Sequence, residues 1–325
     1  MTKRLKVLNL SGCSCLTRTP DLSTLTALDI LNLRECAKVE IHPSVWKLKN
    51  LRELDISGTG RTSAIRPRTK FPYEIGNLEK LEEIYASNNH DLEIPSSIER
   101  LSSLRISILE FTNIYSVPMS ICGLSHLETL DLFYCRKLQS LPDKLPSSLT
   151  SLHVTCQSME TFPSHLSNLI NLKNLVFDHC VNLVEITRDI GKSSQLETLA
   201  LESCNKLRTL PAEIGAISRL KELKLYGCYN LQCILALPPS LFNIRVEYCQ
   251  SLERLPDLSN LKNLSSLTLG HLDKLREILE LGELDYLDIA HCKSLKRLPD
   301  LSNLKNLRKI TLYHPKLSSI FHFTP

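Results

Sequence analysis

Leucine positions recur along the whole chain and set the pattern of buried and exposed residues. The repeating unit reads L-x-x-L-x-L-x-x-C-x-x-L-x-x-L-P, and its clearest copy runs from Leu127 to Pro142. Fourteen copies follow one another at steps of 20 to 24 residues, with one step of 30. Their first leucines are Leu5, Leu28, Leu51, Leu81, Leu104, Leu127, Leu149, Leu172, Leu196, Leu220, Leu241, Leu264, Leu284 and Leu307.

Each copy predicts one short strand followed by one outer turn. Apolar and polar residues alternate within L-x-x-L-x-L, which is the period of a strand. The L-P pair then ends strand pairing. Stretches such as 95–101 and 211–215 favour a single helical turn. We therefore predict an α/β leucine-rich repeat solenoid over residues 1–325, a single domain. It would form a curved horseshoe, with a parallel β-ribbon on the concave face and short helical turns on the convex face.

A column of cysteines follows the strands. A residue used once per coil at an inward position packs the core, so we expect reduced thiols and not a disulfide framework. The thiol can donate to backbone carbonyls left unpaired at the turn, as can Thr59, Asn89 and Thr112 in the same column. Leu272 and Pro315 break this column. Its cysteines are Cys13, Cys36, Cys135, Cys180, Cys204, Cys228, Cys249 and Cys292.

Two further features depart from the regular repeat. Residues 60–70 form a basic insertion with Arg61, Arg66, Arg68 and Lys70 and no acid. Such insertions are usually solvated loops, and a contact with an acidic partner is the alternative. The first copy starts at Leu5 with no polar cap before it, so we expect the chain to be part of a longer protein.

Bulk properties exclude several classes of function. A net charge of +4 is too small to favour nucleic-acid binding. The chain shows no signal peptide and no apolar run long enough for a membrane span, so we expect a cytoplasmic protein. Residues 191–193 resemble the end of a phosphate loop, but Ile186 stands where its first glycine is required. We expect no enzymatic activity and no cofactor.

Polar and aromatic side chains occupy the strand positions that point away from the leucines. Exposed rings among charges of both signs are typical of protein-recognition surfaces. The alternative is that some rings pack along the ribbon and contact no partner. We predict a protein-binding concave face made of Tyr85, Arg105, Glu110, Phe111, Asp131, Phe133, Tyr134, Lys173, His179, Glu202, Lys224, Tyr226, Arg245, Glu247, Tyr248, Tyr286 and Tyr313.

Histidine precedes the cysteine column in four copies, at His179, His271, His291 and His314. The last three come from consecutive repeats, so their rings are expected to lie within about 10 Å of one another. Stacked imidazoles can bind a metal. No carboxylate or thiolate is clearly placed beside them, and we therefore predict surface histidines and no metal site.

The cysteine-type unit resembles the leucine-rich repeats of plant intracellular immune receptors. The similarity is greatest to the class with Toll/interleukin-receptor and nucleotide-binding domains, including flax rust resistance proteins. Residues 8–13 (LNLSGC), 223–228 (LKLYGC) and 207–215 (LRTLPAEIG) carry it. The resemblance implies a repeat region that recognises pathogen effectors and helps to hold the nucleotide-binding domain inactive. Neither a signalling domain nor a phosphate loop is present in this sequence, so nucleotide switching is not implied for it.

Two other functions fit the same pattern. One is a constitutive intracellular scaffold for signalling proteins. The other is the substrate-binding part of a ubiquitin ligase, which residues 141–146 (LPDKLP) loosely resemble. A catalytic helical domain of such a ligase would need well over a hundred further residues. We expect a protein partner, either an effector or a receptor signalling domain.

Overall fold

The structure is a computed structural model that describes residues 4–59, 70–90, 92–298, 301 and 304–313. The chain forms two compact units, Met1–Gln157 and Ser158–Pro325. His314, Pro315 and residues 60–69 of the basic insertion lie outside the described part. Lys70, the last residue of that insertion, pairs with Glu93 at 2.7 Å.

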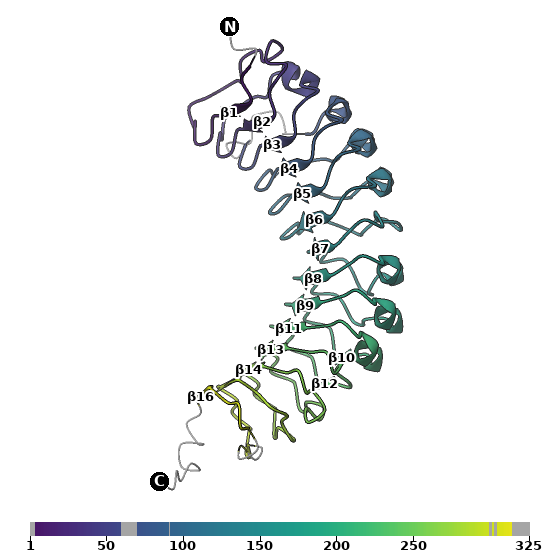
Figure 1. Cartoon of the computed structure of the whole chain (residues 1–325), viewed down its shortest axis with the longest axis vertical. Helices are drawn as coiled ribbons and strands as arrows, with labels where there is room; N and C mark the ends of the chain where they lie inside the picture. The colour runs from purple at the N-terminus through teal and green to yellow at the C-terminus, as the bar shows by residue number, and fades with distance from the viewer. Residues whose placement is uncertain (1–3, 60–69, 91, 299–300, 302–303, 314–325) are drawn as a thin grey trace. The chain divides into compact units, whose positions relative to one another are not determined.

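The described residues of the first unit form seven parallel strands in sequence order (Figure 1). They are β1 (Val7–Asn9), β2 (Ile30–Asn32), β3 (Glu53–Asp55), β4 (Glu83–Tyr85), β5 (Ile106–Ile108), β6 (Thr129–Leu132) and β7 (Ser151–Val154). Its 3-10 helices are η1 (Pro43–Lys47), η2 (Tyr73–Asn77), η3 (Ser96–Arg100) and η4 (Met119–Gly123).

The second unit repeats this arrangement with longer strands. The seven strands of its main sheet, in order, are β8 (Asn174–Asp178), β9 (Thr198–Glu202), β11 (Glu222–Tyr226), β13 (Asn243–Glu247), β14 (Ser266–Gly270), β15 (Tyr286–Ala290) and β16 (Lys309–Tyr313). A two-stranded sheet joins β10 (Thr209–Leu210) and β12 (Cys233–Ile234). Its 3-10 helices are η5 (Ser164–Asn168), η6 (Arg188–Lys192) and η7 (Ala212–Ala216).

The strand register keeps every coil in step with its neighbours. Leu223 on β11 lies opposite Leu199 on β9 and Ile244 on β13, and all three are buried. Lys224, the next residue, points to the other side of the sheet and is half-exposed. Because the side-chain period of a strand is two, this register sends all the leucines of a unit into one core. The predicted leucine-rich repeat solenoid is confirmed.

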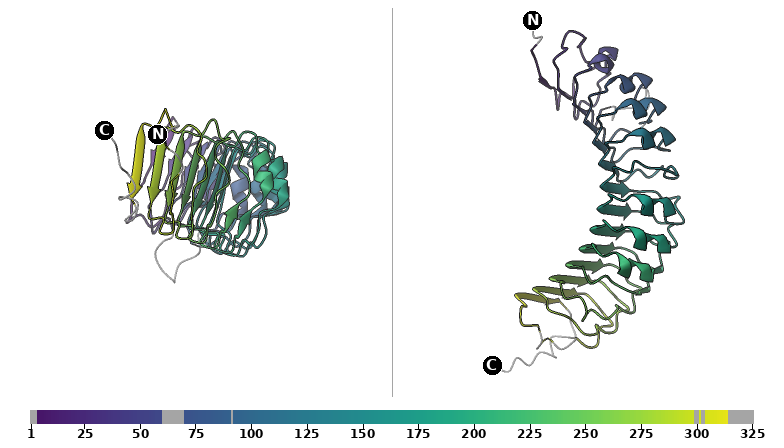
Figure 2. Two further views of the ribbon diagram at one scale, coloured as in Figure 1. Left: turned by 90° about the horizontal axis from the view of Figure 1, so that it is seen from below. Right: turned by 45° about the vertical axis from the view of Figure 1, so that its right-hand side comes forward.

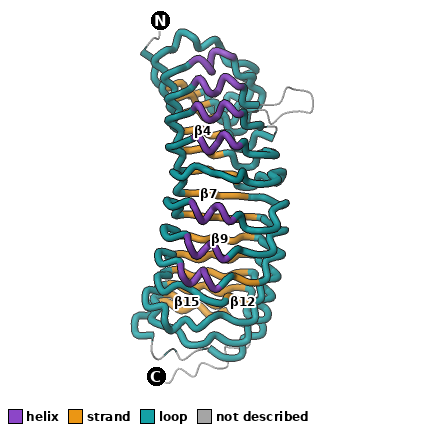
Figure 3. The backbone as a smooth tube through the Cα atoms, turned by 90° about the vertical axis from the view of Figure 1, so that its right-hand side faces the viewer, coloured by secondary structure: helices purple, strands orange, loops and turns teal. Residues whose placement is uncertain are grey.

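Proline marks where the outer turn begins. Pro72, Pro95, Pro118, Pro163 and Pro211 each stand immediately before a 3-10 helix. Proline is pre-set for this position by its fixed φ and has no N–H to leave unpaired. In each unit the helices lie on the side away from the strands (Figures 2 and 3). The helical turns predicted at 95–101 and 211–215 are η3 and η7.

The cysteine column joins each coil to the one before it. The thiol of Cys135 donates to the carbonyl of Leu109 at 3.2 Å, and that of Cys36 donates to Leu10 at 3.0 Å. Burial raises the pKa of Cys135 to about 11, which keeps its thiol protonated as a donor. Cys13, in the first described coil, is exposed and so departs from the expected inward packing. All twelve cysteines are free thiols.

Candidate protein-binding face

The strand face is the side of each unit's sheet that is opposite the helices, formed by side chains that point out of the strands. Most of the predicted binding residues lie on it or directly after the strands. Asp131, Lys224 and Arg245 stand between the two buried residues of their strands. Tyr85 ends β4, next to the buried Ile84. The strand ends and the residues next to them hold Glu110, Phe111, Phe133, Tyr134, His179, Glu202, Tyr226, Glu247, Tyr248 and Tyr313. Tyr286 begins β15.

Arg105 and Lys173 lie elsewhere, in the column that follows the first leucine of each repeat. Charges alternate in sign along this column, and neighbours form ion pairs. Arg105 contacts Glu128 with two hydrogen bonds, of 3.1 and 3.0 Å, and the same column holds the pairs Lys6–Asp29, Arg52–Glu82 and Lys221–Glu197. The guanidinium of Arg105 lowers the pKa of the Glu128 carboxyl. These charges join coil to coil along the beginning of the strands.

The first unit presents acids on its strand face. Glu53 and Glu83 lie directly opposite each other on β3 and β4. Burial, then the charges of Glu83 and Asp55, raises the pKa of Glu53. The hydroxyl of Tyr85 donates to Glu83 at 2.6 Å. Like charges directly opposite in a sheet are destabilising, so electrostatic repulsion between these two carboxylates lowers the stability of this part of the sheet.

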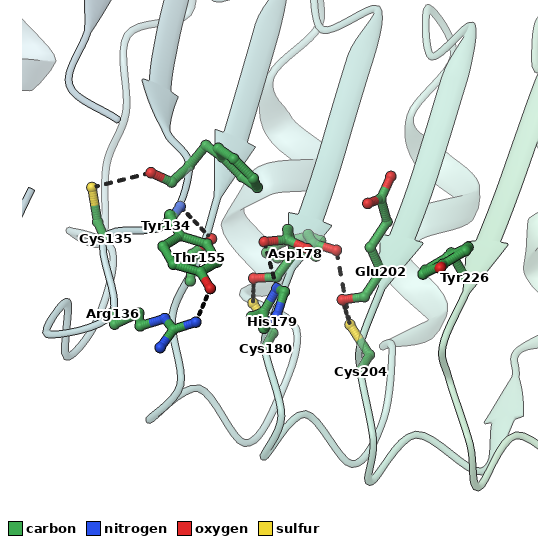
Figure 4. A network of polar contacts seen from close by, with 12 residues as sticks. Tyr134, Cys135, Arg136, Thr155, Asp178, His179, Cys180, Glu202, Cys204 and Tyr226 are labelled. Atoms are coloured by element: carbon green, nitrogen blue, oxygen red, sulfur yellow. Dashed lines mark hydrogen bonds and ion pairs between the residues drawn. The ribbon is translucent and has the colours of Figure 1, made fainter. Parts of the chain in front are cut away.

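Aromatic rings gather next to these acids. The ring centroid of Phe111 lies 5.2 Å from that of Phe133 and 5.0 Å from that of Tyr134. Arg136 lies over the Tyr134 ring at 3.9 Å and also donates to its hydroxyl (Figure 4). The ring of His153 on β7 lies against that of Phe133, with the centroids 4.8 Å apart and the planes tilted by 34°. The polar atom of Tyr134 is therefore already engaged within the unit.

His153 was missed by the sequence analysis. It occupies the same strand position as Asp131, one repeat later, and its Nδ1 lies 3.6 Å from the Asp131 carboxylate. Burial, then the charge of Asp131, raises the pKa of Glu110, whereas His153 opposes this shift. The signal that could have found His153 is its register with Asp131.

Charged groups on the strand face of the second unit are paired locally. Lys224 contacts Glu222 at 3.1 Å, and Arg245 contacts Glu247 at 2.9 Å. His179 contacts the buried carboxylate of Asp178 at 2.7 Å (Figure 4). Because Lys224 and Arg245 each have an acid of their own, they contribute little net charge to the face.

The residue before the cysteine column has an unusual backbone conformation. Its φ is positive in twelve repeats, which is the left-handed region that favours glycine. Glycine occupies three of these positions, including Gly227. The other nine are Glu35, Asn88, Phe111, Tyr134, His179, Ser203, Tyr248, His271 and His291. The turn requires this conformation in each of these repeats, yet several of them have an aromatic residue there and not glycine.

In the second unit three of these rings, Tyr248, His271 and His291, form a ladder of five with Tyr226 and Tyr313, which end β11 and β16. Successive ring centroids are 5.1, 4.2, 4.4 and 4.7 Å apart. The rings of Tyr248 and His271 are nearly parallel, at 10°, and those of His271 and His291 are at 17°. Both faces of the His271 ring are therefore covered by neighbouring rings.

The ladder contributes little net stability. A left-handed conformation costs about 1–2 kcal/mol for a residue with a Cβ, so Tyr248, His271 and His291 together cost about 3–6 kcal/mol. Each aromatic contact stabilises the fold by about 0.5–1.5 kcal/mol, so the four contacts together contribute about 2–6 kcal/mol. The two totals are of the same size.

The described residues contain no group of three or more histidine, cysteine or acidic side chains that could hold a metal ion. His271 and His291 lie closer together than the predicted limit, and their third member, His314, is outside the described part. No helix in the described part has the length and apolar character needed to cross a bilayer.

Comparison with known proteins agrees with this architecture. Residues 190–316 match the family model of plant disease resistance protein RPS2-like leucine-rich repeats. Disease resistance-like protein DSC1 of Arabidopsis thaliana is 30% identical over 56% of the chain and 15% of its own length. Disease resistance protein RPS6 of the same plant is 30% identical over 60% of the chain and 16% of its own length. The chain thus matches only a small part of each relative.

Among solved structures, the leucine-rich repeat protein LIC12759 of Leptospira interrogans has the same fold. It aligns with a TM-score of 0.52 and 23% identity over 92% of this chain and 88% of that one. By fold, then, the chain is a leucine-rich repeat protein. By sequence, it is similar to the leucine-rich repeat regions of plant disease resistance proteins, and the resemblance noted from the repeat unit is confirmed.

Proposed function

We propose that this chain is the recognition region of a plant immune receptor that binds a pathogen effector protein through its strand face, in the cytoplasm. It acts by binding, without catalysis and without a cofactor. The relatives support the receptor context, since those quoted above are disease resistance or disease resistance-like proteins.

One observation carries the choice of surface. The helices occupy the other side of each unit, and in the described part no element packs over the strand face. That face holds exposed aromatic rings among charges, and 44% of Tyr226 and 63% of Tyr313 remain exposed. Tyrosine and arginine are enriched among residues that dominate binding energy in protein interfaces.

The test is a pull-down from infected and healthy plant tissue with the purified chain as bait. A partner present only in infected tissue is expected, and its affinity for the chain is then measured directly. Charge reversal at Lys224 and Arg245 together should weaken that affinity at least tenfold, because they lie opposite each other on β11 and β13, in the middle of the second unit's main sheet.

A matched control is available on the opposite side. The double variant Arg188→Glu with Lys192→Glu reverses two charges on η6 and breaks one ion pair at each position. Reversal of Lys224 and Arg245 also breaks one ion pair at each position, so the two double variants are matched. The control should leave the affinity unchanged. Equal loss in both double variants, or loss in neither, would contradict the strand face as the binding surface.

A further inference from the structure

The five-ring ladder of the second unit differs from the other ring groups of the strand face in its polar atoms. In the first unit the hydroxyl of Tyr85 donates to Glu83, and that of Tyr134 accepts from Arg136. The hydroxyl of Tyr286 donates to Asp288 at 3.0 Å. Within the described ranges, by contrast, the ring nitrogens of His271 and His291 and the hydroxyls of Tyr226, Tyr248 and Tyr313 have no hydrogen-bond partner.

The ladder shows its edges to solvent. Because Tyr248 and His291 cover both faces of His271, a partner can reach only the rim of that ring. The rim of an aromatic ring carries its positive potential, and its face carries the negative one. Imidazole N–H and phenol O–H groups at the rim add hydrogen-bond donors. The ladder is therefore complementary to a row of oxygen acceptors.

The surroundings of the ladder do not supply such acceptors. Glu247 is held by Arg245, and Asp288 accepts from Tyr286, so both nearby acids are engaged. Lys309 on β16 lies over the Tyr286 ring at 5.4 Å and has no carboxylate partner within the described part of the chain. The unengaged ring groups of the ladder can thus donate hydrogen bonds, and Lys309 adds a cation beside them.

We propose that the ladder is the binding site for an extended, acidic segment of a protein partner, whose carboxylates and backbone carbonyls accept from the rims of Tyr248, His271 and His291. The ladder site rests on the proposed function, because it specifies which kind of partner segment binds to this part of the strand face. The first unit, where Glu53 faces Glu83, repels such a segment, so the ladder also sets where on the chain it binds.

The backbone supports a binding role for these rings. Gly227 shows that glycine fills the same turn position in the adjacent repeat, without the strain that a side chain brings. The ring contacts only offset this strain, and strained conformations that give the fold no net stability point to function. The rings of His271 and His291 add little net stability to the fold, so a binding role explains why these two positions have imidazole rings and not glycine.

The experiment uses the full chain and a synthetic peptide of alternating Glu and Ser, with an alternating Lys and Ser peptide as the opposite charge. Binding is followed by NMR of the imidazole signals and by fluorescence anisotropy. The double variant His271→Gly with His291→Gly removes the two central rings. Ser203→Gly is the matched control, because it changes the same turn position, with a φ of 54°, and removes no ring.

The acidic peptide is expected to shift the imidazole signals and to lose at least tenfold in affinity in the double variant. The control should bind as the natural chain does, and the urea midpoint of the double variant should not fall. No binding of the acidic peptide, equal binding of the lysine peptide, or a collapse in stability of the double variant would each overturn the inference. If the double variant keeps a tissue partner that the Lys224 and Arg245 reversals lose, the proposed function stands and the ladder site is wrong.

Discussion

Asn89 offers the sharpest test of what the cysteine column does for the fold. It stands in that column and is 1% exposed. Its amide donates to the carbonyls of Ile56 at 2.9 Å and Ala86 at 3.1 Å, and its oxygen accepts from Thr59 at 3.2 Å. One side chain therefore serves the turn of its own repeat and that of the preceding one.

Asn89→Ala should lower the free energy of unfolding by about 2–4 kcal/mol. Thr59 still donates to the Ile56 carbonyl at 2.8 Å, so that acceptor keeps a partner. The Ala86 carbonyl loses the bond from Asn89, and an orphaned buried acceptor costs about 1–3 kcal/mol. Loss of the second bond adds about 0.5–1.5 kcal/mol.

Asn89→Cys is the matched control. Cysteine at this position elsewhere donates to the preceding coil, as Cys135 does to Leu109. The cysteine variant should therefore retain the bond to Ile56, still leave the Ala86 carbonyl without its partner, and lose about two-thirds as much stability as the alanine variant. Urea unfolding at constant slope measures both. If the two variants lose the same free energy, donation from this column is not what stabilises the turn.

Two further predictions concern the core and the acids of the first unit. Leu132 is fully buried, so Leu132→Ala should lower the free energy of unfolding in urea by about 2–5 kcal/mol. The control Thr129→Ala, which changes an outward residue of the same strand, should lower it by less than about 1 kcal/mol. A loss below about 0.5 kcal/mol for Leu132→Ala would place Leu132 outside the core. Glu53 has a raised pKa, so its charged form is disfavoured in the fold and stability falls as pH rises from its ordinary value of 4.5 towards the raised one. Glu53→Gln should then stabilise the chain at pH 7 and have no effect at pH 3, and a destabilised variant at pH 7 would refute the repulsion from Glu83.

The order of elements could be predicted from the sequence because each repeat encodes its own strand and turn. Leucines three and two residues apart fix the strand, and proline after leucine fixes the start of the outer helix. The donor role of Thr59, Asn89 and Thr112 followed from their place in a column of thiols. All of these are local signals, repeated often enough for the register to be unambiguous.

Contacts between coils are decided by the tertiary structure. The repeat pattern separates the column of Arg105 from the strand position of Arg245, but it does not reveal that Arg105 pairs with Glu128 of the next coil whereas Arg245 pairs with Glu247 of its own strand. The positive φ before the cysteine column cannot be inferred from His271 or Tyr248, since such residues rarely adopt it. Only stacking of consecutive coils brings their rings to 4.2 Å and leaves their rims as the surface that a partner meets.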